Sequence, residues 1–358
     1  MTSFLTTTPL WTLLPIITLG TWAGCSLLLA FMRRRLTEIG ALEKPSVDNL
    51  LTKPLPRGAG LALMLFIVPG LAFCLGTTMQ ARPQDWLLLG LVLLVVIAWF
   101  EDLHPNIPLV ARLVVRGLAA YLGTLALPES FLVFPSLVPN LPFAVDRGAV
   151  ILAWVGLMGG YARTDSLSGL SSILTLGLVG GVALVMSLPL GADPVDLRLA
   201  ALLIGAAAAA FVFTWPPAKL ILGHAGTIPL GFLAGYLLLK LGATGCLPAA
   251  LILILYPAAE GVITPLRWMF QRKPFPGAPS CERVARALGN PRKALCEVAI
   301  LQGGLIALAL GSTMNGACVW PPYVAGGLAV ALVGAALGRW NFLGRRAQVP
   351  AEDAAPSA

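Results

Sequence analysis

The chain has 358 residues, of which 58% are hydrophobic and only 11% are charged, and its mean hydropathy is +0.86. A soluble domain usually carries about 25% charged residues, so this composition excludes an ordinary water-soluble globular protein. The net charge of +8 does not indicate nucleic-acid binding, because no basic stripe interleaves with aromatic residues and cytoplasmic loops of membrane proteins carry such an excess.

Eleven apolar segments follow one another along the chain, and each approaches or reaches the ~20 residues that a helix needs to cross a bilayer. Backbone groups cannot be solvated in lipid, so these segments predict helices. We expect an all-α polytopic membrane protein with about 10–11 transmembrane helices, forming one integral membrane domain over 1–346 and a disordered tail over 347–358. The apolar segments are 8–31, 58–78, 86–100, 109–127, 148–160, 168–190, 198–214, 226–243, 248–266, 294–312 and 318–338.

The distribution of basic residues predicts an orientation. Segment 32–57 is rich in arginine and lysine and is placed on the cytoplasmic side, and strict alternation then puts most of the 24 basic residues on that side. The N-terminus is therefore predicted to lie outside and the C-terminus inside. The basic residues left outside are Arg82, Arg147, Arg198 and Lys240.

The first polar segment of interest is 53–62 (KPLPRGAGLA), just before the second apolar segment. Glycines at a helix start let backbone N–H groups approach an anion, and Arg57 adds a fixed positive charge. The segment is consistent with phosphate binding, although taken alone it favours a basic loop that enters a helix.

The second is the pair Glu101 and Asp102 at the end of the third apolar segment. Hard cations such as Mg²⁺ prefer carboxylate oxygens, and a carboxylate can also accept a proton. The alternative is an acidic pair at a hydrated helix end.

The third is 161–170 (YARTDSLSGL), in which Asp165 is the acidic residue. This carboxylate is a candidate for metal or substrate contact, or for the N-cap of the next helix.

The fourth is 215–227 (WPPAKLILGHAGT), which contains Lys219 and His224. Lys219 is a candidate phosphate ligand. An imidazole suits Zn²⁺ better than Mg²⁺. His224 is therefore a candidate metal ligand, hydrogen-bond donor to phosphate, general base or polar residue at the membrane interface.

A long basic segment follows at 267–293, with a short amphipathic helix expected at 282–286. Its residues Arg267 and Arg272 are candidates for binding substrate phosphate, or for attraction to anionic lipid at about 1 kcal/mol per basic residue.

These segments, in this order, resemble the motifs of the polyprenyl-phosphate N-acetylhexosamine-1-phosphate transferases. This superfamily, glycosyltransferase family 4, includes the undecaprenyl-phosphate GlcNAc-1-phosphate transferases and the phospho-MurNAc-pentapeptide transferases. The chain departs from the family pattern as a divergent member. The family has Asp at the positions of Glu101, Ser168 and His224, Asn at Ala162, and a His-rich loop that this chain lacks, since its two histidines are His104 and His224.

The resemblance implies transfer of a sugar 1-phosphate, such as N-acetylhexosamine-1-phosphate, from a UDP-sugar to undecaprenyl phosphate, with release of UMP. The reaction would occur at the cytoplasmic face of the inner (plasma) membrane, in synthesis of cell-envelope polysaccharide or peptidoglycan lipid intermediates, with Mg²⁺ or Mn²⁺ as cofactor and a homodimer as one assembly. Carried over by position, Asp102, Glu101 and Asp165 would be catalytic. The phosphate ligands would be Arg57, Lys219, Arg267 and Arg272, and the metal ligands Asp102, Asp165 and His224.

Two further readings stay open. The substitutions at Ala162, Ser168 and His224 favour a catalytically inactive homologue that binds polyprenyl phosphate or a partner enzyme as a scaffold. The retained acidic residues and the Pro-Pro-Ala-Lys run favour an active transferase. An unrelated transporter is disfavoured, because transporters place ionisable groups at mid-membrane and these apolar segments carry few, with Glu260 the main exception.

Overall fold

The computed structural model describes residues 10–45, 51, 53–75, 82–104, 107–128, 132–133, 142–188, 193–271, 280–313 and 321–346. Within the helices, the side chains of Leu10, of 264–271 and of 344–346 are not described. The predicted tail over 347–358 lies outside the described residues.

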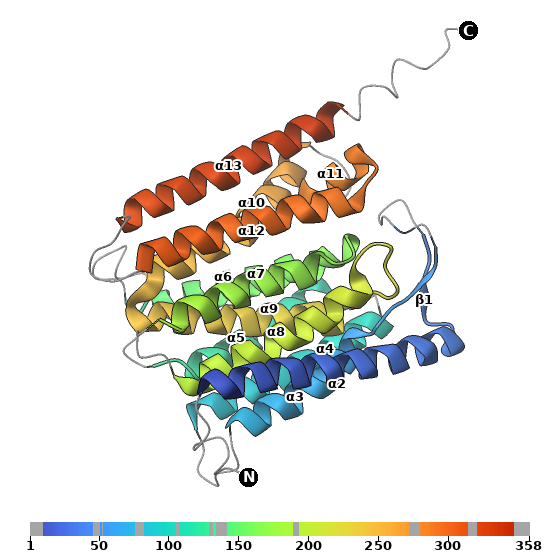
Figure 1. The fold of residues 1–358 in the computed structure, drawn as a ribbon, viewed down its shortest axis with the longest axis horizontal. Coiled ribbons are helices and arrows are strands. Elements are labelled where there is room, and N and C mark those ends of the chain that lie inside the picture. The colour runs from blue at the N-terminus through green and yellow to red at the C-terminus, as the bar shows by residue number, and fades with distance from the viewer. Residues whose placement is uncertain are drawn as a thin grey trace.

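Within these ranges, every one of the eleven predicted apolar segments forms a helix, and a short helix follows Ser280 as the amphipathic pattern predicted (Figure 1). The long helices lie side by side in one bundle, with the N-terminal helix on one flank and the C-terminal helix on the other. Their bounds are α2 (Leu10–Ile39), α3 (Gly60–Leu75), α4 (Pro83–Leu103), α5 (Leu109–Leu125), α6 (Phe143–Arg163), α7 (Leu170–Met186), α8 (Pro194–Thr214), α9 (His224–Leu241), α10 (Leu247–Gln271), α11 (Ser280–Leu288), α12 (Pro291–Thr313) and α13 (Pro322–Arg346).

In the part of the chain that the structure describes, seven helical stretches are long and apolar enough to cross a membrane, and the apolar helices α3 and α7 are shorter. The prediction of an all-α polytopic membrane protein is confirmed. One of the seven stretches runs from His224 to Ile263 over 40 residues. At 1.5 Å per residue it would be about 60 Å long, twice the hydrocarbon core, so it cannot be one span.

Gly245 divides that stretch into α9 and α10. Its φ is +87°, inside a five-residue π-helical turn over Gly242–Cys246. Only glycine adopts this conformation without strain, so the two helices meet at a built-in turn, and α10 packs back against α9, α6 and α7.

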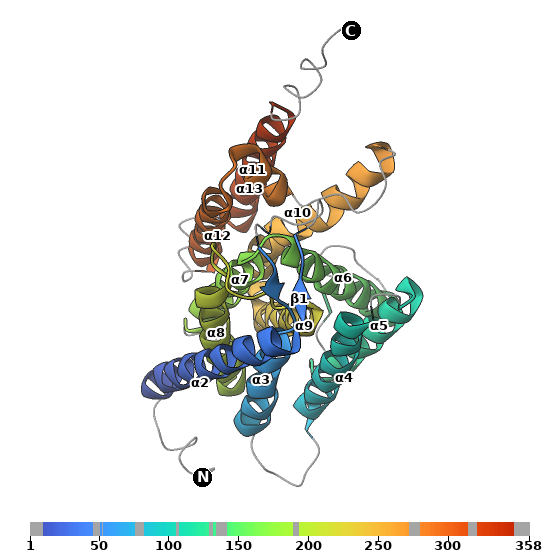
Figure 2. The same cartoon turned by 90° about the vertical axis from the view of Figure 1, so that its right-hand side faces the viewer.

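Helix α9 forms the centre of the bundle (Figure 2). The helices α3, α4, α6, α7 and α8 pack around it. Almost every residue of α9 from Ala225 to Leu238 is buried, which agrees with a helix that is apolar on all sides. The N-terminus of α9 therefore meets the ends of several helices at one end of the bundle.

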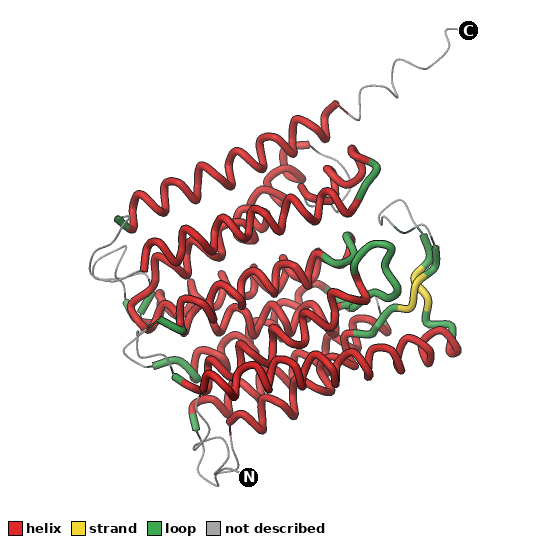
Figure 3. Tube along the Cα trace, viewed as in Figure 1, coloured by secondary structure: helices red, strands yellow, loops and turns green. Residues whose placement is uncertain are grey.

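A two-stranded antiparallel hairpin, which the sequence analysis did not predict, lies over that end (Figure 3). Its strands are β1 (Leu42–Glu43) and β2 (Leu55–Pro56), and Arg57 continues it with a parallel bridge to Ile221. The backbone N–H of Gly60 donates to the carbonyl of Leu222 at 2.7 Å. The segment before α3 is thereby fixed to the loop before α9.

Candidate functional site

The carboxylate of Asp102 binds the N-terminus of α9. The backbone N–H of His224 donates to Oδ1 at 3.0 Å, and that of Ala225 donates to Oδ2 at 2.9 Å. These N–H groups have no partner inside their own helix, and the helix dipole favours a negative charge there. Gly223 makes the approach possible, because its φ is +76° and a Cβ at this position would lie 2.6 Å from Asp102 Oδ2. Asp102 thus caps a helix 122 residues further along the chain.

Glu101, the neighbour of Asp102, is fixed by two nitrogen groups. Its Oε2 accepts a hydrogen bond from Arg116 Nη2 at 3.0 Å, and it lies 3.4 Å from His224 Nδ1. The side chains of Glu101 and Arg116 are 2% and 9% exposed, so their pairing satisfies two charges that are costly to bury alone. A protonated His224 would form a second ion pair with the same oxygen.

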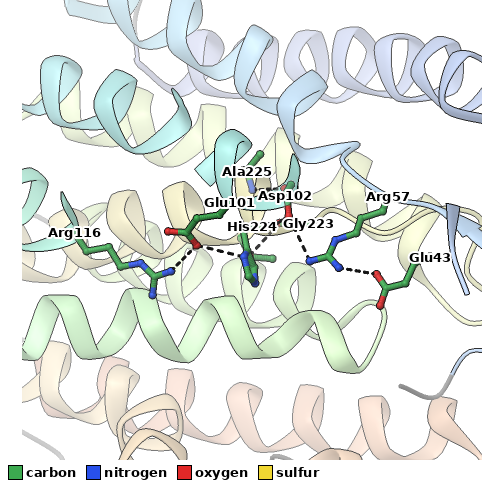
Figure 4. Close-up of polar contacts among 9 residues, drawn as sticks. Glu43, Arg57, Glu101, Asp102, Arg116, Gly223, His224 and Ala225 are labelled. Atoms are coloured by element: carbon green, nitrogen blue, oxygen red, sulfur yellow. Dashed lines mark hydrogen bonds and ion pairs between the residues drawn. The ribbon is translucent and has the colours of Figure 1, made fainter. Parts of the chain in front are cut away.

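Arg57 connects the hairpin to Asp102. Its Nη1 lies 3.2 Å from Glu43 Oε2, and its Nη2 lies 3.4 Å from Asp102 Oδ1. The Arg57 side chain is 35% exposed, in contrast to Asp102 at 6%. We call the residues Glu43, Arg57, Glu101, Asp102, Arg116 and His224 the charged cluster (Figure 4).

Asp165 lies beside the charged cluster in a 3₁₀ turn (Thr164–Ser166) between α6 and α7. This turn contacts α9, whose first residue is His224. Its Oδ2 is buried and has no hydrogen-bond partner among the described residues. The helix-capping alternative does not apply, since the residue before α7 is Gly169, with a φ of +92°. Asp165 therefore presents a carboxylate oxygen that no contact in the described structure uses.

A cleft of about 520 Å³ opens next to Asp165. Arg292 donates from Nε to the carbonyl of Pro216 at 2.8 Å on its wall. Both polar and apolar residues line the cleft, and the polar ones are Lys53, Ser166, Ser168, Asn290 and Arg292.

One predicted phosphate ligand, Lys219, lies outside the charged cluster. The ammonium group of Lys219 lies 5.8 Å from the centroid of the Phe213 ring, and the Lys219 backbone N–H donates to the Phe213 carbonyl. The exposed Lys219 side chain thus contacts an aromatic ring. Arg267 belongs to α10, but its side chain is not described, and Arg272 lies outside the described residues.

The sequence analysis missed three residues of this end of the bundle, namely Glu43, Arg116 and Arg292. Arg116 carried a usable signal, because a charged residue within an apolar helix is expensive unless it has a partner. Glu43 carried none, since its place depends on the unpredicted hairpin. Arg292 reads in the sequence as one more basic residue of the long cytoplasmic segment.

The predicted metal ligands Asp102, Asp165 and His224 form a poor coordination site for a divalent cation as they are arranged in the structure. Mg²⁺ requires near-octahedral oxygen coordination. Both oxygens of Asp102 already accept backbone N–H groups, and Glu101 Oε2 faces two nitrogen groups. Asp165 Oδ2 is left as a free oxygen, and the third predicted ligand, His224, is a nitrogen donor. Among the described residues, no group of three or more His, Cys, Asp or Glu side chains is placed to hold a metal ion. The residues do not fit the ion as arranged, and its binding stays a prediction.

Comparison with known proteins agrees with the motifs. Residues 85–242 match the sequence model of Glycosyl transferase family 4. A curated relative, the probable undecaprenyl-phosphate N-acetylglucosaminyl 1-phosphate transferase of Bacillus subtilis (strain 168), is 26% identical over 212 residues. The match covers 56% of this chain and 55% of the relative, so the chain spans about half the length of the curated relative it matches. The family match includes the positions of Glu101, Asp102, Asp165 and His224. The chain is thus similar to Glycosyl transferase family 4 over residues 85–242 and to this relative over 212 residues, in agreement with the ordered motifs.

Proposed function

We propose that the protein transfers a sugar 1-phosphate, specifically N-acetylhexosamine-1-phosphate, from a UDP-sugar to undecaprenyl phosphate. An oxygen of the lipid phosphate attacks the phosphorus that carries the sugar. One pyrophosphate P–O bond forms between lipid phosphate and sugar phosphate, and the P–O bond to UMP breaks. UMP leaves with the electron pair of that bond. The product would be a lipid-linked intermediate of cell-envelope polysaccharide or peptidoglycan synthesis.

The observation that carries this proposal is the meeting of four separate sequence segments at one end of the bundle. The Arg57 guanidinium and the backbone N–H of His224 each lie within ion-pair or hydrogen-bond distance of Asp102, and Asp165 comes from the fourth segment, in a turn that contacts α9. A packing role alone gives no reason for four polar segments of a membrane protein to gather charged groups around an unused carboxylate oxygen.

The arrangement supplies what phosphoryl transfer requires, which is positioning of two anions and stabilisation of the charge that develops. Arg57 is the more exposed of the two arginines in the charged cluster and would contact a phosphate oxygen. Asp165 would accept the proton that a singly protonated lipid phosphate loses. The adjacent cleft, with Lys53 and Arg292 on its wall, would receive the nucleotide sugar from the cytoplasm.

Turnover can be measured directly with purified protein in lipid nanodiscs. Labelled UDP-N-acetylhexosamines and undecaprenyl phosphate are supplied, with Mg²⁺ or Mn²⁺ in one arm and EDTA in the other. We expect lipid-linked label and UMP in equal amounts. Asp165→Asn should lower the rate by about 10²-fold or more, because general acid–base groups contribute on that scale.

The matched control is Glu38→Gln, which removes a carboxylate from an exposed pair with Arg35 on α2. This variant should keep the wild-type rate. Absence of product across a panel of UDP-sugars, from protein that is folded and binds undecaprenyl phosphate, would reject the enzymatic proposal.

A second candidate function is the inactive scaffold, which the use of Asp102 as a helix cap favours. Both of its oxygens are bound to α9, so this carboxylate is poorly suited to act as a base. A scaffold of this kind would bind undecaprenyl phosphate and release no UMP under any condition of the same assay.

A further inference from the structure

Each carboxylate of the charged cluster faces a positive group without an added ion. Glu101 is paired with Arg116, Glu43 is paired with Arg57, and Asp102 faces the partial positive charge at the N-terminus of α9. Each of the three carboxylates thus has its own positive partner at 2.9–3.4 Å.

A divalent cation would have to compete with these partners. Each oxygen of Asp102 already accepts one backbone N–H, so a metal ion could use only the second lone pair of each, and these oxygens are weakened as metal ligands by the hydrogen bonds. An ion bound through Glu101 Oε2 would lie next to the Arg116 guanidinium, which is 9% exposed and whose positive charge repels it. Both effects oppose metal binding.

Arg57 has the position and the freedom that a phosphate ligand needs. It is the least buried member of the two arginine pairs, and it bridges Glu43 and Asp102 through separate nitrogens. Its Nε is buried without a hydrogen-bond partner in the described part of the chain. An arriving phosphate oxygen can therefore replace one carboxylate on a guanidinium that is already held in place from both sides.

His224 adds a nitrogen group where a third carboxylate would otherwise complete a metal site. The side chain begins at the first residue of α9, is 22% exposed, and faces Glu101 rather than pointing away from the charged cluster.

We infer that this site works without a bound divalent cation, and that Arg57, assisted by His224, supplies the positive charge facing the reacting phosphates. The inference rests on the proposed transferase function. The same bond forms and the same bond breaks as described above, and the charge on the leaving UMP oxygen is met by side chains.

Metal binding can be tested independently of turnover by titrating Mn²⁺ into purified full-length protein and following free Mn²⁺ by electron paramagnetic resonance. Wild-type protein should leave the Mn²⁺ signal equal to that of buffer with empty nanodiscs. His224→Asp restores an oxygen ligand beside Glu101 and Asp165, and should bind Mn²⁺ stoichiometrically. Stoichiometric binding by wild-type protein that Asp165→Asn abolishes would overturn the inference.

The turnover assay gives the second readout. The wild-type rate in EDTA should stay within about twofold of the rate in Mg²⁺, whereas Arg57→Gln should lose at least about 10²-fold in kcat/KM. Activity that EDTA abolishes and Mg²⁺ restores would also overturn the inference. If no condition gives product, the proposed function fails, and the Mn²⁺ titration still decides whether the site holds a metal. Thermal unfolding of each variant separates loss of function from loss of fold.

Discussion

At the scale of single residues, the structure gives Asp102 a role that its motif did not suggest. The sequence pattern indicated a base or a metal ligand, and the geometry shows a carboxylate whose two oxygens hold the first turn of the central helix. Sequence reasoning found Glu101, Asp102, Asp165 and His224 because acidic and histidine residues at the ends of apolar segments are conspicuous. It could not find which partner each one has. Arg116 is brought to the site by the packing of α5, and Glu43 by a hairpin whose strands are too short to leave a sequence pattern.

We predict that Asp102→Asn weakens the fold as well as any activity. An amide offers one acceptor oxygen in place of two and carries no charge for the helix dipole. The free energy of unfolding should fall by about 1–2 kcal/mol, the scale of a lost N-cap. Thermal unfolding in detergent measures this, with the exposed Glu38→Gln as a control that leaves the midpoint unchanged. An unchanged midpoint in Asp102→Asn would show that the cap does not contribute to stability.

At the scale of elements, the contact between α3 and α9 sets the geometry of the site. A Cβ added at Gly60 would lie 2.2 Å from the backbone nitrogen of Gly226, so the two helix starts approach backbone to backbone. Sequence analysis predicted all the long helices from their apolar composition. It ended the first apolar segment at residue 31, although α2 continues to Ile39, because the basic residues that suggested a loop project from a helix that extends beyond the apolar segment. It also missed the hairpin, whose strands are two residues each.

We predict that Gly60→Ala separates α3 from α9. The clash is with backbone atoms that cannot rotate away, so the cost should be about 1–3 kcal/mol, as for overpacked interiors. Gly20→Ala in α2 is the matched control, since a Cβ there meets nothing within 4 Å. Thermal unfolding should show a lower midpoint for Gly60→Ala and an equal or higher one for Gly20→Ala. Equal midpoints in the two variants would contradict the close contact.

At the scale of the whole molecule, the basic residues and the helix order together predict how the chain crosses the membrane. The charged cluster lies at one end of the bundle, and the turn at Gly245 separates two helices that run in opposite directions. The orientation itself comes from the sequence alone, through the asymmetry of arginine and lysine. Contacts inside the protein cannot determine this orientation, because it is defined relative to the two sides of the bilayer.

We predict opposite results from two fusions to alkaline phosphatase, an enzyme that is active only when exported. A fusion after Gly245 should be active, because that turn is expected outside. A fusion after Arg346 should be inactive, because the C-terminus is expected in the cytoplasm. Fluorescent protein fused at the same two sites should give the reverse pattern. Matching signals at both positions would refute the predicted topology.

The hairpin connects α2 to the charged cluster. The N–H of Ala41 bonds the carbonyl of Leu36 in α2, and the N–H of Arg57 bonds the carbonyl of Ala41, so two hydrogen bonds link the helix to the guanidinium-bearing residue. α2 itself exposes large apolar side chains such as Trp11, Leu19 and Leu27 along its length. A thicker or thinner bilayer changes the tilt of such a helix. We therefore expect the chain length of the surrounding lipid to act on the position of Arg57 through α2.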